Sequence, residues 1–166
     1  MNVLIVSLLL PIFPVMEDGP NKAVPELQVL SKYVGTWDAD IKGELVIKAV
    51  MTVKWILNGN YLEMETIISE DSGTFDKKKS KTFMTYDREK KVYRTWSFDD
   101  MGQTVVTEGS WNSKSQTMTM TERIGEITIT STADFSKSGI IEWHGIVSDK
   151  DGKFIKEATS VSKRRK

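Results

Sequence analysis

Apolar and polar side chains alternate along most of the chain, which is the pattern of β-strands with one buried face. Residues 47–57, for example, place Met51 and Trp55 on one face and Lys48 on the other. Asn58-Gly59-Asn60 then supplies residues that tolerate the tight turn of a hairpin. The same alternation, with turn residues between the segments, predicts ten strands, over residues 38–41, 47–57, 61–69, 81–86, 92–98, 105–111, 117–123, 127–135, 140–147 and 154–161.

The spacing of these segments predicts an all-β fold. Strands that follow one another every 8 to 14 residues or so, with turn residues between them, are typical of sandwiches and barrels. All four prolines lie in the first 25 residues, so the strand region lacks the residue that removes a ladder donor. Closure removes the exposed edges of a large sheet. We therefore predict an antiparallel up-and-down barrel of roughly ten strands.

One segment has a different period. Leu27, Leu30 and Val34 recur at helical spacing, and Pro25 is tolerated in the first turn of a helix. The pattern predicts one short helix over residues 26–34, which caps an end of the barrel. No other helical period of domain size interrupts the strands.

The first residues have a composition of their own. Residues 3–15 form an apolar run of 13 residues, shorter than the roughly 20 that a membrane-spanning helix needs. The run has the length of a signal-peptide core, but no Lys or Arg precedes it and no small-x-small cleavage site follows. Residues 1–15 are therefore either a signal segment, a retained anchor, or the product of a start codon placed upstream of Met16.

These features give the domain organisation that we expect. Residues 16–24 form a linker, and residues 25–166 form a single barrel domain. The protein is exported, to the periplasm or outside the cell, if residues 1–15 are a signal peptide, and it is cytoplasmic otherwise. The sequence predicts no stable membrane span.

Composition narrows the classes of partner. The 23 basic and 23 acidic residues cancel, and the basic residues are scattered apart from the C-terminal tail, so no continuous positive field is available for nucleic acid. The chain contains no cysteine, which removes disulfides, thiolate metal sites and cysteine nucleophiles together. A hydrophobic share of 39% with 28% charged residues is typical of a globular domain.

Catalytic motifs are missing. The sequence has no G-x-S-x-G elbow, no phosphate-binding loop and no dinucleotide-binding glycine pattern, so we nominate no catalytic residue. His144 is the only histidine, and one histidine without cysteine cannot build a zinc site of the usual kind, so no metal site is predicted. Two interpretations of His144 stay open: an axial haem ligand, or a solvated strand residue on the face that it shares with Glu142.

Large, soft apolar side chains are the remaining unusual feature. The chain has five tryptophans and eight methionines, most of them on predicted strands. Thioethers adapt to irregular shapes and indoles offer rigid apolar plates, so both suit a pocket for an apolar ligand, although both also suit a filled core. The candidate ligand-binding residues are Met51, Trp55, Met64, Trp96, Trp111, Met118, Met120 and Trp143.

A family resemblance adds to this picture. The predicted helix followed by Gly35-Thr36-Trp37 resembles the calycin signature of lipocalins and fatty-acid-binding proteins. The segments PELQVLSKYVGTWDADIK, MTYDREKKVYRTWSFDDMG, VTEGSWNSKSQTMTMT, ITSTADFSKSG and KEATSVSKRRK, taken together, resemble the bacterial family called domain of unknown function 1579 over about residues 25–166.

The resemblance implies a lipocalin-like barrel and brings no established activity. In calycins a tryptophan packs across the barrel floor beside a basic residue of the last strand. Here that tryptophan is Trp37, and the basic residue is Arg164 or Arg165.

Three functional hypotheses follow from the sequence. The first is a non-enzymatic carrier or sensor that binds a small apolar or amphipathic molecule in the barrel lumen, with no cofactor. The second is a haem-binding protein that uses His144, similar to the nitrobindin branch of calycin-like barrels. The third is a structural or interaction module whose interior is filled by its own side chains.

Overall fold

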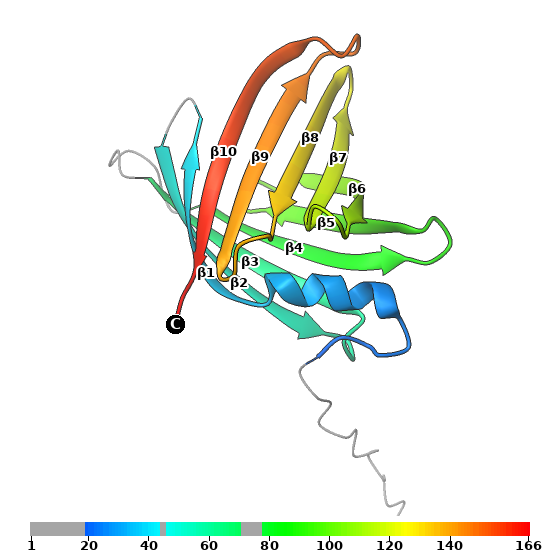
Figure 1. The fold of residues 1–166 in the computed structure, drawn as a ribbon. Coiled ribbons are helices and arrows are strands. Elements are labelled where there is room, and N and C mark those ends of the chain that lie inside the picture. The colour runs from blue at the N-terminus through cyan, green and yellow to red at the C-terminus, as the bar shows by residue number, and fades with distance from the viewer. Residues whose placement is uncertain (1–18, 44–45, 71–77) are drawn as a thin grey trace, which may run out of the picture.

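The computed structural model describes residues 19–43, 46–70 and 78–166, and these form a closed barrel of ten antiparallel strands with one short helix (Figure 1). The predicted fold class is confirmed. The expectations for residues 1–15, for a start at Met16 and for the first part of the linker fall outside the described residues.

The barrel begins with a 3₁₀ helix and continues as an unbroken series of strands. Their bounds are η1 Pro25–Tyr33, β1 Gly35–Lys42, β2 Val46–Ile56, β3 Tyr61–Glu70, β4 Lys78–Asp87, β5 Val92–Asp99, β6 Thr104–Asn112, β7 Thr117–Ile124, β8 Ile127–Asp134, β9 Ile140–Ser148 and β10 Phe154–Arg164.

Each strand pairs with its neighbour in the chain, and the last strand returns to the first. β1 lies between β2 and β10, with Trp37 opposite Arg164 and Ile41 opposite Ser160 in the closing pair. Every backbone edge is thereby paired, which is the advantage of closure over an open sheet. The closing register also fixes which side chains of β1 and β10 face one another inside the barrel.

The helix η1 covers one end of the barrel, while the β7–β8 and β9–β10 hairpins extend at the other end (Figure 1). η1 is a 3₁₀ helix with about three residues per turn, so Leu27, Leu30 and Tyr33 fall along one line. Leu27 and Leu30 are fully buried in the core. The Tyr93 hydroxyl, from the barrel wall, donates a hydrogen bond of 2.9 Å to the Glu26 carbonyl oxygen. The helix is therefore anchored to the barrel by both packing and a hydrogen bond.

Part of the expected linker packs on the barrel. The Asn21 backbone N–H donates to the Gly59 carbonyl oxygen at 2.9 Å, and its side-chain amide donates to the Asn60 side-chain oxygen at 2.9 Å. Val24 is buried in the core. Gly59 has a φ of +73°, and a Cβ there would collide with the Gly19 carbonyl oxygen, so only glycine lets the segment approach this turn.

Two details of the strands differ from the alternation pattern. The alternation over residues 47–57 puts Leu57 on the same face as Met51 and Trp55, but β2 ends at Ile56 and Leu57 is an exposed turn residue with a φ of +50°. In β5 the apolar side faces outward, because Tyr93 and Thr95 are the buried residues while Phe98 is exposed. Trp96 shares the outer face with Phe98, since side chains of a strand alternate between its two sides.

Candidate functional site

The barrel encloses a cavity of about 360 Å³. Its wall receives side chains from every strand except β6 and, at the end covered by η1, from Tyr33. Most of the lining side chains in the described ranges are apolar, several carry hydroxyl groups, and none of them is charged. The described part of the barrel is therefore hollow, with an apolar and uncharged interior.

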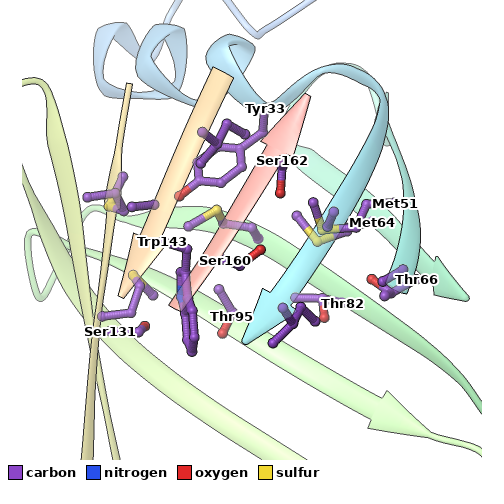
Figure 2. A pocket seen from close by; sticks show the side chains of 18 of the residues that line it. Tyr33, Met51, Met64, Thr66, Thr82, Thr95, Ser131, Trp143, Ser160 and Ser162 are labelled. Carbon is purple, nitrogen blue, oxygen red and sulfur yellow. The ribbon is translucent and has the colours of Figure 1, made fainter. Parts of the chain in front are cut away.

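Five of the eight candidate ligand-binding residues meet around this cavity. They are Met51, Met64, Met118, Met120 and Trp143. Figure 2 shows the Met51 and Met64 side chains on one side of the cavity and the Trp143 indole on another. Met84, which is not among the candidates, also lines the cavity, so five thioethers and one indole give the wall a surface that can adapt to the shape of an apolar molecule.

The Trp143 indole lies against Gly145, two residues further along β9. A Cβ at position 145 would come within 2.7 Å of the indole atom Cζ2, a distance that the ring could relieve only by moving. Gly145 therefore lets the indole lie against the barrel wall beside the cavity. This is a close approach that requires glycine.

We expect Gly145→Ala to push the Trp143 indole into the cavity and to lower the free energy of unfolding by about 1 kcal/mol, the low end for overpacking, because the ring has empty space beside it. The measurement is urea denaturation, together with tryptophan emission in the Gly145→Ala protein and in the same variant carrying Trp143→Phe. If Gly145→Ala changes the emission equally in the natural protein and in the Trp143→Phe background, the displaced ring is not Trp143.

The floor of the barrel joins the helix to the closing strands. Trp37 is 1% exposed, its indole Nε1 donates to the Tyr33 carbonyl oxygen at 2.7 Å, and the Arg164 guanidinium carbon lies 4.4 Å from its ring centroid. Arg164 also donates to the Lys32 carbonyl oxygen at 3.1 Å. Such a stacked cation interacts favourably with the face of an indole.

Of the two arginines suggested by the resemblance, Arg164 is the one over Trp37. Arg165 instead forms an ion pair with Asp38, with its Nη2 atom 2.6 Å from Oδ1. Hydrogen bonding to this guanidinium lowers the pKa of the exposed Asp38 carboxyl.

Comparison with known proteins places the chain in a family. The family model described as "Protein of unknown function (DUF1579)" matches residues 22–144. This chain belongs to that family. No curated protein matches the sequence of this DUF1579 member.

Several solved structures resemble this DUF1579 barrel, Rv2717c and a phycobiliprotein lyase among them. The structure of Rv2717c from M. tuberculosis has a TM-score of 0.67 at 11% identity, over 86% of this chain and 99% of that one. The S-type phycobiliprotein lyase CPES from Guillardia theta has a TM-score of 0.60 at 12% identity, over 82% of this chain and 90% of that one. At these identities the likeness concerns the fold alone.

Three of the candidate tryptophans do not line the cavity of the DUF1579 barrel. Trp55 is buried in the core cluster that also holds Leu27 and Leu30, and Trp111 packs against Phe135 with ring centroids 5.9 Å apart. Both belong to the packed core around the helix. Trp96 lies in an outer groove, with the Arg94 guanidinium carbon 5.1 Å from its ring.

His144 also faces away from the cavity. Its Nε2 atom lies 2.9 Å from the Glu157 Oε2 atom, and 44% of its side chain is exposed. His144 is therefore not placed to hold a haem iron within the cavity. In the described ranges, no group of three or more histidine, aspartate or glutamate side chains is arranged to hold a metal ion. Among the same residues, no helix has the length and hydrophobicity required to cross a membrane.

The hydroxyl groups of the cavity are the residues that sequence reasoning missed. They belong to Tyr33, Thr66, Thr82, Thr95, Ser131, Ser160 and Ser162. The alternation places Thr66 on the same strand face as Met64, but no hydroxyl residue is among the candidate ligand-binding residues, which are all tryptophans and methionines. A usable signal was present in β10, where the small residues Ala158, Ser160 and Ser162 recur at every second position. Small side chains on one strand face leave space inside a barrel.

Proposed function

We propose that the protein binds one small, mostly apolar molecule inside the barrel, and that it carries or senses this molecule without altering it. The observation that carries the proposal is the cavity of about 360 Å³ inside the barrel, with its thioether and indole lining. Pockets for small molecules typically measure about 300 to 1,000 Å³ and are lined mainly by apolar side chains. The cavity therefore has the size and the chemistry of a ligand site.

The same cavity argues against the filled-interior hypothesis. Protein interiors are packed to the density of organic crystals and leave few voids larger than a water molecule. A void of this size forfeits the dispersion contacts that its lining would make with a filled core. Occupation by a ligand would restore those contacts. The haem-binding hypothesis gains no support, because His144 lies outside the cavity wall.

The proposal is tested with N-phenyl-1-naphthylamine, a neutral fluorophore whose emission rises in apolar surroundings. We expect saturable binding of one probe per protein. At a probe concentration of about 100 times Kd, linkage predicts about 2.7 kcal/mol of added stability, measured as a rise in Tm. Native mass spectrometry should show the one-to-one complex.

A matched control separates the cavity from the outer groove. Trp96→Ala alters the groove and leaves every cavity-lining residue in place. It should therefore bind the probe as the natural sequence does. A Trp96→Ala protein that no longer binds would assign the probe to the outer groove, and an unaltered Tm without saturable emission would reject the proposal.

A further inference from the structure

The cavity holds hydroxyl groups of two kinds. Thr82 and Thr95 are satisfied within the protein, because their hydroxyls lie 2.8 Å from the Ser97 hydroxyl and 2.6 Å from the Thr107 hydroxyl. Within the described part of the chain, the hydroxyls of the other five form no hydrogen bond; these are Tyr33, Thr66, Ser131, Ser160 and Ser162.

These five hydroxyls are open to the cavity, and the buried polar atom without a partner among the described residues is instead Arg94 Nε. A ligand that fills the cavity would bury the hydroxyls, so it determines whether they have a partner. Buried polar groups in proteins are nearly always hydrogen-bonded, and an unmade bond forfeits the solvation that the group had in water. Ser160 and Ser162 are 8% and 3% exposed. An apolar ligand without a polar group would leave such hydroxyls unsatisfied. A ligand that carries a hydrogen-bonding atom would satisfy them.

Tyr33 is the donor with the best-defined chemistry. Its ring packs edge-on against Phe135, with centroids 4.7 Å apart, and Figure 2 shows its hydroxyl pointing into the cavity. Burial raises the pKa of this phenol far above its ordinary value, so the group stays protonated at neutral pH. The Tyr33 hydroxyl is thus available as a hydrogen-bond donor to a ligand oxygen.

Hydroxyl groups lie at both ends of the cavity, because Ser131 and Thr95 lie near Trp143, but the phenol lies at the helix end. Figure 2 shows Tyr33 and Ser162 at the end beneath the helix, and Trp143 further from it. Ser160 lies two residues before Ser162 on β10, also lines the cavity, and pairs with Trp143 on β9. A bound molecule can therefore direct a polar atom towards the Tyr33 phenol at the helix end, while its body lies beside the indole and the hydroxyl groups near it.

Charge is the feature that the cavity cannot accommodate. Among the residues that the structure describes, no lining residue is acidic or basic. An ionised group that enters an apolar site without a counter-ion loses its hydration and gains no ion pair in return. A carboxylate or an ammonium group is therefore disfavoured at every position of this wall.

We propose, on the basis of the proposed function, that the ligand is an uncharged amphipathic molecule with a hydrogen-bond acceptor such as a ketone or ester oxygen. The Tyr33 hydroxyl donates to this oxygen, and Ser162 and Ser160 provide the neighbouring hydroxyls. The apolar part lies along the thioethers and against Trp143. Fatty acids and other anions are disfavoured, because the described part of the wall offers them no cation.

Three probes of similar shape test this inference: 2-acetylnaphthalene, 2-isopropenylnaphthalene and 2-naphthoate. They differ in carrying a ketone, a hydrocarbon isostere of the ketone, or a carboxylate. Each is measured by displacement of N-phenyl-1-naphthylamine at neutral pH. We expect the ketone to bind at least about tenfold more tightly than the carboxylate, which has no counter-ion.

The Tyr33→Phe variant assigns the hydrogen bond. It should weaken binding of the ketone by about tenfold, as expected for loss of a donor to a buried acceptor, and leave the affinity for the hydrocarbon unchanged. Tyr61→Phe is the matched control, because Tyr61 lines the outer groove and lies outside the cavity wall. It should leave all three affinities unchanged. Ser162→Ala, which should weaken the ketone selectively, provides a second reading if Tyr33→Phe fails to fold.

The outcomes separate the two proposals. Equal weakening of ketone and hydrocarbon in both Tyr33→Phe and Ser162→Ala would make these hydroxyls packing groups only and would overturn the inference. Binding of 2-naphthoate as tight as that of the ketone would also overturn it, while the carrier proposal would stand. A natural protein that binds neither the fluorophore nor any naphthalene probe would reject the carrier proposal itself.

Discussion

Trp37→Ala is expected to lower the free energy of unfolding by about 3–5 kcal/mol, the usual cost of deleting a large buried aromatic side chain. Trp37 is 1% exposed and is among the largest fully buried side chains of the described residues. The substitution would also remove the donor to the Tyr33 carbonyl oxygen and the ring beneath Arg164. Because these contacts join η1, β1 and β10, we expect the helix to detach before the barrel unfolds.

This prediction is measured by urea denaturation, with circular dichroism for the sheet and probe binding for the cavity. Trp96→Ala is the control of the same chemistry on the outer face, and it should cost less because it leaves a smaller cavity. Arg164→Met keeps the aliphatic contact over Trp37 and removes the cation, so it should cost about 0.5–2 kcal/mol. Equal losses in Trp37→Ala and Trp96→Ala would contradict the structural role given to Trp37.

The number and order of the strands were predictable because each signal was local and repeated. Period-two alternation, short turns such as Asn58-Gly59-Asn60 and a proline-free strand region all point to one meander. Closure followed from the need to pair the edges of so large a sheet. The 3₁₀ form of η1 was not predictable, because a spacing of three residues between Leu27 and Leu30 fits an α-helix as well as a 3₁₀ helix.

The inward face of β5 could not be derived from hydrophobicity. Trp96 lies outward opposite Phe83 on β4 and Val106 on β6, while Thr95 faces the cavity. More than half of the surface of a folded protein is apolar, so an apolar strand face is not necessarily an inner one. Which face turns inward is set by register with both neighbouring strands, and register is a long-range property.

The candidate site was only partly predictable for a related reason. The methionines and Trp143 could be nominated because their chemistry suits an apolar pocket. Tyr33 could not, because its place depends on how the helix lies across the barrel end. Trp55 and Trp111 could not be separated from cavity residues either, since the sequence does not tell how far the helix fills the interior.

Filling the cavity should abolish binding while the fold is retained. In the double variant Ser131→Leu/Ser160→Leu, two leucine side chains occupy space that the natural protein leaves empty, and two unpaired hydroxyls disappear. Burying one leucine side chain contributes about 1.5–3 kcal/mol, which is offset in part by any strain of repacking. We expect unchanged or higher Tm, and affinity for N-phenyl-1-naphthylamine lowered at least about 100-fold, since the leucines would have to be displaced.

The matched control places the same side chains on the other face of the same strands. Thr132 and Thr159 adjoin Ser131 and Ser160 in sequence and do not line the cavity. Thr132→Leu/Thr159→Leu should therefore bind the probe as the natural protein does.

Three outcomes of Ser131→Leu/Ser160→Leu can be told apart. If its Tm falls as it would on overpacking a filled core, the interior has no room for the leucines or for a ligand. If the variant folds well and the probe still binds, the site lies elsewhere. Loss of binding with Tm retained would tie binding to the empty space itself, because the inward and outward variants add the same atoms.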